Sequence, residues 1–455
     1  MNTSAPTPSL GLATLVAVAV GVIVAQSTMV SLLQATAIGG WGFVGAMAIG
    51  FALMLCNSAT YAELALMMPR ASGMSAYIQA GLGPLPAIFA VFAGYVVPAL
   101  FGPAAELLLV DAVLGQLLPA TLPALGWAAL LLGVLVVLNL FGTDVFARVQ
   151  TVLTFTMLVF LVLTGLAAWA APAALPAAGA SSPSGMGEAI TVFGVVALVM
   201  YSLIGTEFVT PLTALARDPA RNVPRAMFVG LAVVALANLV FCLGAAHAVG
   251  RDKLGSSPLP HLDAAIAAFG PQVKLVFAAI AVTATASLVN TVLAAVPRML
   301  MEMARSGEAF PIFRRVNSRG VPWVGTLFVA ALPMVGLAWS GGDVNRIVPL
   351  LIAAASAWLV SYMVAHGSLM ALRRRAPQRS RPWRAPWHPT PQLLAIVGMA
   401  YVIANAAPAP ELEKPIFMAL AAVLGLVAAI GTAWVLLVMR RPPFAPMEHD
   451  DVDAH

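Results

Sequence analysis

Long apolar segments recur from one end of this 455-residue sequence to the other. A helix needs roughly 20 largely apolar residues to cross the hydrocarbon core of a bilayer, and these segments are long enough. Backbone N–H and C=O groups cannot stay unpaired in lipid, so such segments must be helical. Residues 128–140 and 418–439 show no apolar/polar alternation, which argues against the strands of a membrane β-barrel. The sequence therefore predicts an all-α polytopic membrane protein.

Composition and charge exclude several other classes of protein. Hydrophobic residues make up 61% of the chain and charged residues only 9%, whereas soluble domains are about one quarter charged. The net charge is +5, but the arginines lie between apolar segments instead of forming one basic face, so we expect membrane lipid and no nucleic acid as a partner. Cys56 and Cys242 lie in apolar segments, and His247 and His366 have no partner at metal-ligand spacing. We therefore predict no disulfide, no metal and no cofactor.

Twelve transmembrane helices account for the apolar segments and for the distribution of Lys and Arg. We place them at 10–34, 39–66, 84–118, 123–141, 146–170, 188–216, 226–249, 272–304, 322–339, 346–372, 391–408 and 415–439. With the N-terminus inside, 18 of the 23 Lys and Arg residues fall in inner segments and five in outer loops. The first nine residues carry no Lys or Arg, so no cleavable signal sequence is expected. The chain is predicted to lie in the cell inner membrane of a bacterium with both termini in the cytoplasm.

Four motifs at the ends of apolar segments carry a resemblance. In chain order they are YAELALMMPRASGMSAY (61–77), YSLIGTE (201–207) with DPARNVPRA (218–226), SLVN (287–290) with ARSG (304–307) and PIFRRVN (311–317), and LRRR (372–375) with RPWRAP (381–386). Together they resemble the amino acid, polyamine and organocation (APC) transporter superfamily, and its amino acid permeases in particular. The resemblance covers most of residues 10–390. Four such motifs in the right order make it specific.

The resemblance implies the leucine-transporter fold, in which spans 1–5 and 6–10 form inverted repeats and spans 1 and 6 are broken at the bilayer midplane. Two further C-terminal helices follow in this arrangement. The implied division is an N-terminal cytoplasmic tail, a first repeat, a second inverted repeat, a basic cytoplasmic loop, the last two helices and a C-terminal cytoplasmic tail: 1–9, 10–170, 188–372, 373–390, 391–439 and 440–455.

Broken helices leave backbone amides and carbonyls free to bind the carboxylate and ammonium of a substrate. Gly205 lies where the resemblance implies the break in span six. In span one the matching residues are Ala-Gln-Ser-Thr (25–28), where the family usually has a Gly-Ser-Gly type of sequence. The residues expected to contact substrate are Ala25, Gln26, Ser27, Thr28, Tyr201, Ser202, Gly205, Asn290 and Trp358. Ordinary packing is the alternative for Tyr201 and Trp358, and helix–helix hydrogen bonding is the alternative for Asn290.

Carboxylates inside membrane spans are expensive and need an explanation. Glu207 follows the expected break by two residues, and we predict a role in gating or proton coupling, with a structural hydrogen bond as the alternative. The same pair of interpretations applies to Glu106, which lies near Pro103. Many proton-coupled relatives have a lysine in span five, where this chain has Met157, so any proton coupling is expected to use a carboxylate. Ion pairs that close an inner gate and simple interfacial solvation both fit the residues near the span ends: Glu63, Glu302 and Arg298.

The sequence thus predicts a secondary transporter, a permease or an exchanger, that moves an amino acid or related amine by alternating access. Its partners are the small-molecule substrate and a coupling proton or an exchanged substrate, and both a monomer and a homodimer stay open. The alternative is a transporter-like amino acid sensor or regulatory subunit with little flux. An enzyme is not expected, because the chain has no His-rich metal set, Gly-x-Ser-x-Gly motif or paired carboxylates.

Overall fold

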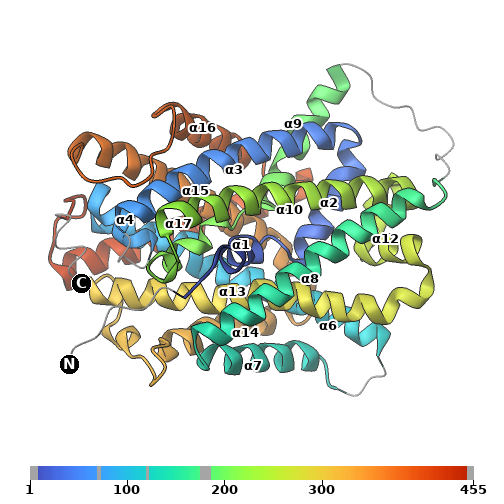
Figure 1. Cartoon of the computed structure of the whole chain (residues 1–455), viewed down its shortest axis with the longest axis horizontal. Helices are drawn as coiled ribbons and strands as arrows, with labels where there is room; N and C mark the ends of the chain where they lie inside the picture. The colour runs from blue at the N-terminus through green and yellow to red at the C-terminus, as the bar shows by residue number, and fades with distance from the viewer. Residues whose placement is uncertain (1–8, 69–72, 119–121, 175–185, 448–455) are drawn as a thin grey trace.

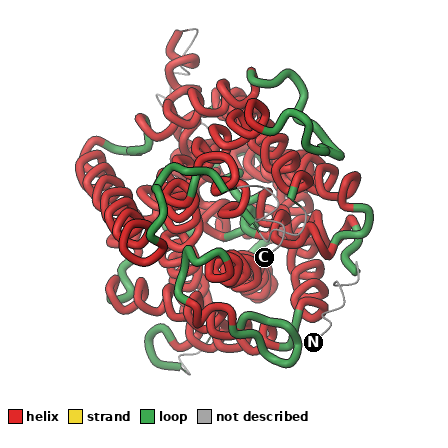
Figure 2. The backbone as a smooth tube through the Cα atoms, turned by 90° about the vertical axis from the view of Figure 1, so that its left-hand side faces the viewer, coloured by secondary structure: helices red, strands yellow, loops and turns green. Residues whose placement is uncertain are grey.

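The computed structural model describes residues 9–68, 73–118, 122–174 and 186–447. The predicted N-terminal tail therefore lies almost wholly outside the described residues, as do the end of the C-terminal tail and residues 69–72 of the first motif. Both ends of the described chain lie at the same end of the molecule, on the left in Figure 1 and toward the viewer in Figure 2.

Every regular element of the described chain is a helix, and most helices run along the long axis of the molecule (Figure 1). Nine helical segments in these ranges are long and apolar enough to cross a membrane. They are α3 (Gly42–Met67), Pro84–Leu117 (α5, η1 and α6), α8 (Thr143–Ala170), Gly194–Leu215 (the end of α9, with η2), α10 (Pro219–Val249), Pro271–Arg305 (η3 and α13), α14 (Trp323–Ser340), Arg346–Arg375 (in α15) and Pro410–Met439 (α17 and η5).

A tenth segment qualifies only as a bent pair. Helices α1 (Leu12–Gly21) and α2 (Gln26–Gly39) meet at an angle of 64° across residues 22–25. Two shorter apolar helices, α7 (Gly126–Leu140) and α16 (Thr390–Ala404), lie where the fourth and eleventh spans were predicted. Each has 15 residues, fewer than the roughly 20 that a perpendicular crossing needs. The chain is therefore an all-helical polytopic membrane protein with about ten candidate spans, and the count of twelve is not established.

The remaining bounds complete the helical framework. Parts of the long segments are α5 (Pro84–Val91), η1 (Phe92–Val96), α6 (Val97–Leu117), α9 (Met186–Tyr201), η2 (Thr206–Leu215), η3 (Pro271–Val273), α13 (Lys274–Arg305), α15 (Val344–Arg375), α17 (Pro410–Ala433) and η5 (Trp434–Met439). The short connecting helices are α4 (Met74–Leu82), α11 (Arg251–Ser256), α12 (Pro260–Phe269) and η4 (Pro311–Arg314). Several helices begin with proline in the first turn, among them α5, α10 and α12, where a missing N–H costs nothing.

Burial separates central from peripheral helices. In the segment that contains α13, 72% of the most apolar 18-residue stretch is buried inside the protein, compared with 11% in the segment that contains α17. Helix α13 packs against α6, α7, α8 and α14, and it also touches both α1 and η2. The interrupted helices are thus held at the centre of the bundle, while the last long helix presents most of its surface outward.

Candidate functional site

Two helices are interrupted at the centre of the bundle, and the two interruptions touch. Helix α1 ends at Gly21 and α2 begins at Gln26, while α9 ends at Tyr201 and the 3-10 helix η2 begins at Thr206. Gly205 has φ of +138°, a conformation that side-chain-bearing residues rarely adopt. A Cβ on Gly205 would lie 3.0 Å from Cβ of Val22 in the other break. The close approach of the two breaks therefore depends on glycine at this position.

A cavity of about 120 Å³ lies against both breaks. Its walls come from α2, η1, α6, α9, η2, α13 and α15, so most of the central helices contribute. Five of the nine residues predicted to contact substrate line it: Ser27, Thr28, Tyr201, Ser202 and Trp358. Ala25, Gln26 and Gly205 lie at the breaks but outside the lining. The structure therefore brings eight of the nine to one region.

Asn290, the ninth, lies in a separate polar network between α7, α8 and α13. Its Nδ2 donates to Oε1 of Gln150 at 2.8 Å, and its Oδ1 accepts from Nδ2 of Asn139 at 2.8 Å. The same network reaches the end of α1, where Ser287 Oγ donates to the carbonyl of Gly21 at 3.0 Å. Both sides of the Asn290 amide are thus bonded to other helices, and Asn290 does not line the cavity.

Glu106, on α6, caps the first turn of α2. Its Oε1 accepts from the backbone N–H of Ser27 at 2.7 Å, and its Oε2 accepts from that of Gln26 at 3.1 Å. The hydroxyl of Thr285 donates to the same Oε2 at 3.2 Å. A helix start carries partial positive charge and free N–H groups, so a carboxylate is stabilised there. Glu106 is fully buried, and its carboxylate is bonded to backbone amides of the broken helix and not to a positively charged side chain.

The side chain of Gln26 continues this network away from the cavity. Its Nε2 donates to Oγ1 of Thr285 at 2.8 Å, and its Oε1 lies 3.3 Å from Nε2 of His261 on α12. The backbone of Gln26 and its side chain thus bond to α6 and α13 on one side and to α12 on the other. This arrangement fixes the start of α2 in one position.

Glu207, in the first turn of η2, is fully buried but less completely bonded than Glu106. Its Oε1 accepts from the Tyr95 hydroxyl at 3.3 Å, and its Oε2 has no hydrogen-bond partner among the described residues. The Tyr362 hydroxyl and the Trp358 indole N–H approach the same carboxylate and are themselves buried without a partner. Such unsatisfied buried groups are costly in a membrane interior and mark functional sites.

Aromatic rings surround this carboxylate. The rings of Tyr95, Phe208 and Trp358 lie with their centroids 5.5–5.6 Å from one another, and all three line the cavity. The ring of Tyr362 follows at 6.4 Å from Trp358. Of these four, only Trp358 was predicted to contact substrate. Tyr95 lies on the π-helical turn η1, which contains Gly94 and is followed by Pro98, and π turns often occur at functional sites.

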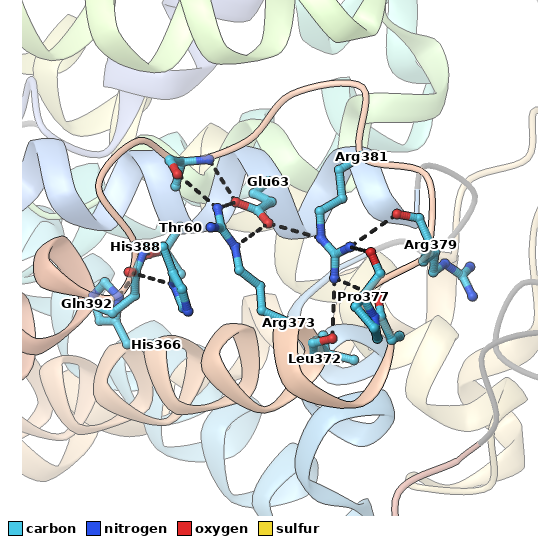
Figure 3. A network of polar contacts seen from close by, with 12 residues as sticks. Thr60, Glu63, His366, Leu372, Arg373, Pro377, Arg379, Arg381, His388 and Gln392 are labelled. Carbon is cyan, nitrogen blue, oxygen red and sulfur yellow. Dashed lines mark hydrogen bonds and ion pairs between the residues drawn. The ribbon is translucent and has the colours of Figure 1, made fainter.

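A second buried carboxylate site lies where the loop after α15 packs on α3. We call Glu63, Arg373 and Arg381 the Glu63 cluster; Figure 3 shows Glu63 between the two arginines. Arg373 Nε donates to Glu63 Oε1 at 2.9 Å and its Nη2 to Oε2 at 2.5 Å, while Arg381 Nε lies 3.2 Å from Oε1. The backbone N–H of Ala385 donates to Oε2 at 2.7 Å. Of the two interpretations of Glu63, the ion pair is the one that the structure contains.

The other residues near the span ends have smaller connections. Glu302 pairs with Arg305 across one helical turn at 3.4 Å. Arg298 donates from Nη2 to the hydroxyl of Thr143 at 2.8 Å. On α6, Asp111 caps α7 by accepting from the backbone N–H groups of residues 125, 127 and 128 at 3.1–3.2 Å.

Comparison with known proteins places the chain in a family. The sequence matches the family described as Amino acid permease over residues 10–429. It is 25% identical over 381 residues to the serine/threonine exchanger SteT of Bacillus subtilis, which covers 78% of this chain and 81% of SteT. It is also 25% identical over 228 residues to a probable GABA permease of Pseudomonas aeruginosa, which covers 47% of this chain and 46% of that permease.

The fold has a counterpart among solved structures. Mhp1, a nucleobase-cation-symport-1 family transporter in a closed conformation with bromovinylhydantoin bound, is similar with a TM-score of 0.57 and 15% sequence identity. The match covers 100% of this chain and 99% of Mhp1, and it shows a fold of the leucine-transporter type. Because the family match takes in nearly the whole sequence, the chain belongs to the amino acid permease family of secondary transporters.

Proposed function

We propose that the chain moves a small amino acid or related amine across a bacterial inner membrane by alternating access, as a permease or an exchanger. The observation that carries this proposal is the contact between two helix breaks beside a central cavity. In folds of this type the substrate binds near the bilayer midplane, where interrupted helices expose unpaired backbone groups. Here Ser27 and Thr28 from one break and Ser202 from the other line the same cavity.

The orientation in this proposal is that both termini face the cytoplasm, with the Glu63 cluster on the same side as the ends of the chain. The excess of Lys and Arg in the predicted inner segments supports it. The common position of the two described chain ends is compatible with it (Figures 1 and 2).

Counterflow in proteoliposomes tests transport directly. Purified protein is reconstituted into vesicles loaded with an unlabelled candidate, and uptake of the labelled compound is measured over a panel of small amino acids and amines. We expect saturable counterflow of at least one compound. Binding without counterflow, measured by thermal shift on the same preparation, would instead favour the sensor.

Gly205→Val tests whether the cavity at the breaks is the transport site. The Cβ of a valine there would lie 3.0 Å from Cβ of Val22, which is closer than van der Waals contact, and the valine would need a backbone conformation that it rarely adopts. We therefore expect counterflow to be lost. The matched control is Gly194→Val in α9, because an added Cβ at Gly194 meets no atom within 4 Å. Normal counterflow by Gly205→Val would place the transport site elsewhere.

A further inference from the structure

The backbone amides at the start of α2 are already bonded to a carboxylate of the protein itself. In this fold the N-termini of half-helices point toward anionic groups of the substrate. Here the amides of Gln26 and Ser27 donate to the Glu106 carboxylate at 3.1 and 2.7 Å. Ser27 lines the cavity, so this is the same helix start that a substrate would meet. A substrate carboxylate would have to displace Glu106 to bond to these amides.

The second half-helix also begins with an internal carboxylate. Glu207 stands in the first turn of η2, on the other side of the breaks, and its Oε2 has no hydrogen-bond partner in the described chain. A glutamate therefore lies at each helix start, although only the amides of α2 are bonded to one, because Glu207 accepts from the Tyr95 hydroxyl instead. A further negative charge at either start would be repelled by the one already there.

No positive side chain offsets these two glutamates. The described residues that line the cavity include neither Lys nor Arg. Glu106 and Glu207 form no ion pair in the described chain. A zwitterion entering the cavity would find no counter-charge for its carboxylate. A cation would be attracted by two buried carboxylates that bond to the lining residues Ser27 and Tyr95, in a medium of low dielectric constant.

The aromatic lining suits a cation as well. Tyr95, Phe208 and Trp358 present three mutually inclined rings to the cavity, beside the Glu207 carboxylate. Aromatic faces attract ammonium groups, and the attraction is strongest where water is excluded.

From this arrangement we propose that the cavity takes a small primary-amine cation without an α-carboxylate, and that Glu106 stands where an amino acid would place its own carboxylate. The inference rests on the proposed function and narrows its substrate class. It assigns the ammonium group to the side of the cavity lined by Tyr95, Phe208 and Trp358, where the Tyr95 hydroxyl bonds to the Glu207 carboxylate. The hydroxyl-bearing side of the cavity, at Ser27 and Thr28, is left for a polar group on the amine.

Matched compounds that differ only in the carboxylate test the inference on the wild-type protein. The pairs are ethanolamine with serine, 1-amino-2-propanol with threonine, and ethylamine with alanine, each measured by thermal shift and by counterflow. We expect the amine of each pair to bind at least about tenfold more tightly than the amino acid. Amino acids that bind and exchange as well as the amines would overturn the inference and leave the proposed function intact. Neither binding nor flux of any compound in the wider panel would reject both.

Glu106→Ala tests the role of the carboxylate itself. Removing it frees the two amides, so we expect amine binding to fall and serine binding to rise, which narrows or inverts the selectivity ratio. Sodium formate supplies a carboxylate without an amine, and we expect it to restore amine binding to the variant. Unchanged selectivity in a folded Glu106→Ala protein would contradict the inference. If this variant does not fold, the wild-type pairs decide alone.

Asp111→Ala is the matched control for that variant. Asp111 lies on the same helix and also caps a helix start, that of α7, but it bonds to no residue that lines the cavity, whereas Glu106 bonds to Ser27. We expect this variant to keep the wild-type preference for amines. A loss of selectivity equal to that of Glu106→Ala would show that the effect comes from helix capping in general, which would overturn the assignment of Glu106.

Discussion

The Glu63 cluster and the central cavity both bury carboxylates, but they provide opposite surroundings. Glu63 is held by two arginines and one backbone amide (Figure 3). Glu106 is held only by neutral donors, and Glu207 by a single tyrosine hydroxyl. The carboxylate of the first site has two positive partners, while those of the second have no counter-charge.

This difference distinguishes a structural ion-pair cluster from a binding site. A buried carboxylate with two arginines can persist in one conformation, because its charge is compensated and both of its oxygens are bonded. Arg381 also donates to the carbonyls of Leu372 and Ala376, so the cluster ties the loop after α15 to the end of that helix and to α3. Carboxylates without counter-charges are expensive inside a membrane, and proteins retain them where a proton or a cation arrives. We therefore expect substitutions at the two sites to affect different measurements.

The largest effect is expected from Glu63→Gln. It leaves two arginines at a buried site without their counter-charge, and removing one partner of a buried pair costs about 3–5 kcal/mol. We expect a large fall in the thermal midpoint of the protein in nanodiscs. Lys253→Gln, which breaks an exposed pair with Asp263, is the control, with an expected loss of about 0–1 kcal/mol. Equal losses of stability in the two variants would mean that the Glu63 cluster does not stabilise the fold.

Glu207→Gln tests the other half of the comparison. The amide keeps the size of the side chain and mimics the protonated carboxyl, so we expect any pH dependence of flux to flatten. Binding of an amine cation should weaken, because the charge that would attract its ammonium group is removed. The measurement is the initial rate of counterflow in proteoliposomes between about pH 5.5 and pH 8, with the thermal midpoint recorded in parallel. An unchanged pH profile would leave Glu207 as a structural hydrogen-bonding residue and direct attention to Glu106. A wild-type flux that is independent of pH would remove the premise of proton coupling.

Glu308 is a third buried carboxylate without a counter-charge in contact, and it lies outside the spans in the loop after α13. Its Oε2 accepts from the hydroxyls of Ser75 and Ser306, and its Oε1 has no partner in the described chain. Burial raises the pKa of Glu308 from 4.5 to about 7, an effect that nearby Glu302 adds to and Arg441 opposes. The folded protein therefore holds this proton more tightly than the unfolded chain does.

The sign of the pH effect follows from this difference. The contribution of Glu308 to stability is full below about pH 4.5 and is lost as the pH rises to about 7, by at most about 1.4 kcal/mol per pH unit. We expect Glu308→Gln to remove this slope from the thermal midpoint measured between pH 5 and pH 8. The exposed Glu411→Gln is the control and should keep the wild-type slope. A parallel slope in wild type and Glu308→Gln would show that this carboxyl does not titrate in that range.

Local sequence was sufficient for most of the long helices and for the neighbourhood of the breaks, but the predicted count of twelve spans is not established. The segment predicted at 84–118 is the continuous Pro84–Leu117, because one apolar run fixes both its length and its environment. Asn290 shows the limit of such reasoning. The cavity-lining Leu288 lies two residues away on α13, which places the two side chains on opposite faces of the helix. Nothing in the local sequence indicates which of these faces meets the cavity.

Contacts between residues that are far apart in the chain could not be predicted from the sequence. Glu106 bonds to amides 79 and 80 residues away, and Glu63 bonds to an arginine 310 residues away. Such pairs are set by how the helices pack, so a single sequence reveals that a buried carboxylate needs a partner but not which partner it finds. Tyr95 is a similar case, because Gly94 and Pro98 beside it do not indicate that its hydroxyl meets Glu207, 112 residues away.

The smallest effect is expected from Tyr201→Phe, which separates the ring from the hydroxyl of a predicted substrate contact. The Tyr201 hydroxyl lies 2.8 Å from Oγ of Ser356, and that Oγ also donates to the carbonyl of Ile352 at 2.9 Å. Because Ser356 keeps its second partner, losing the hydroxyl should cost about 1 kcal/mol or less in the thermal midpoint experiment. The ring still lines the cavity, so counterflow should stay close to wild type, whereas Tyr201→Ala removes the ring and should reduce it strongly. If Tyr201→Phe loses counterflow while its thermal midpoint is unchanged, the hydroxyl contacts the substrate directly, and the polar side of the cavity includes α9 as well as α2.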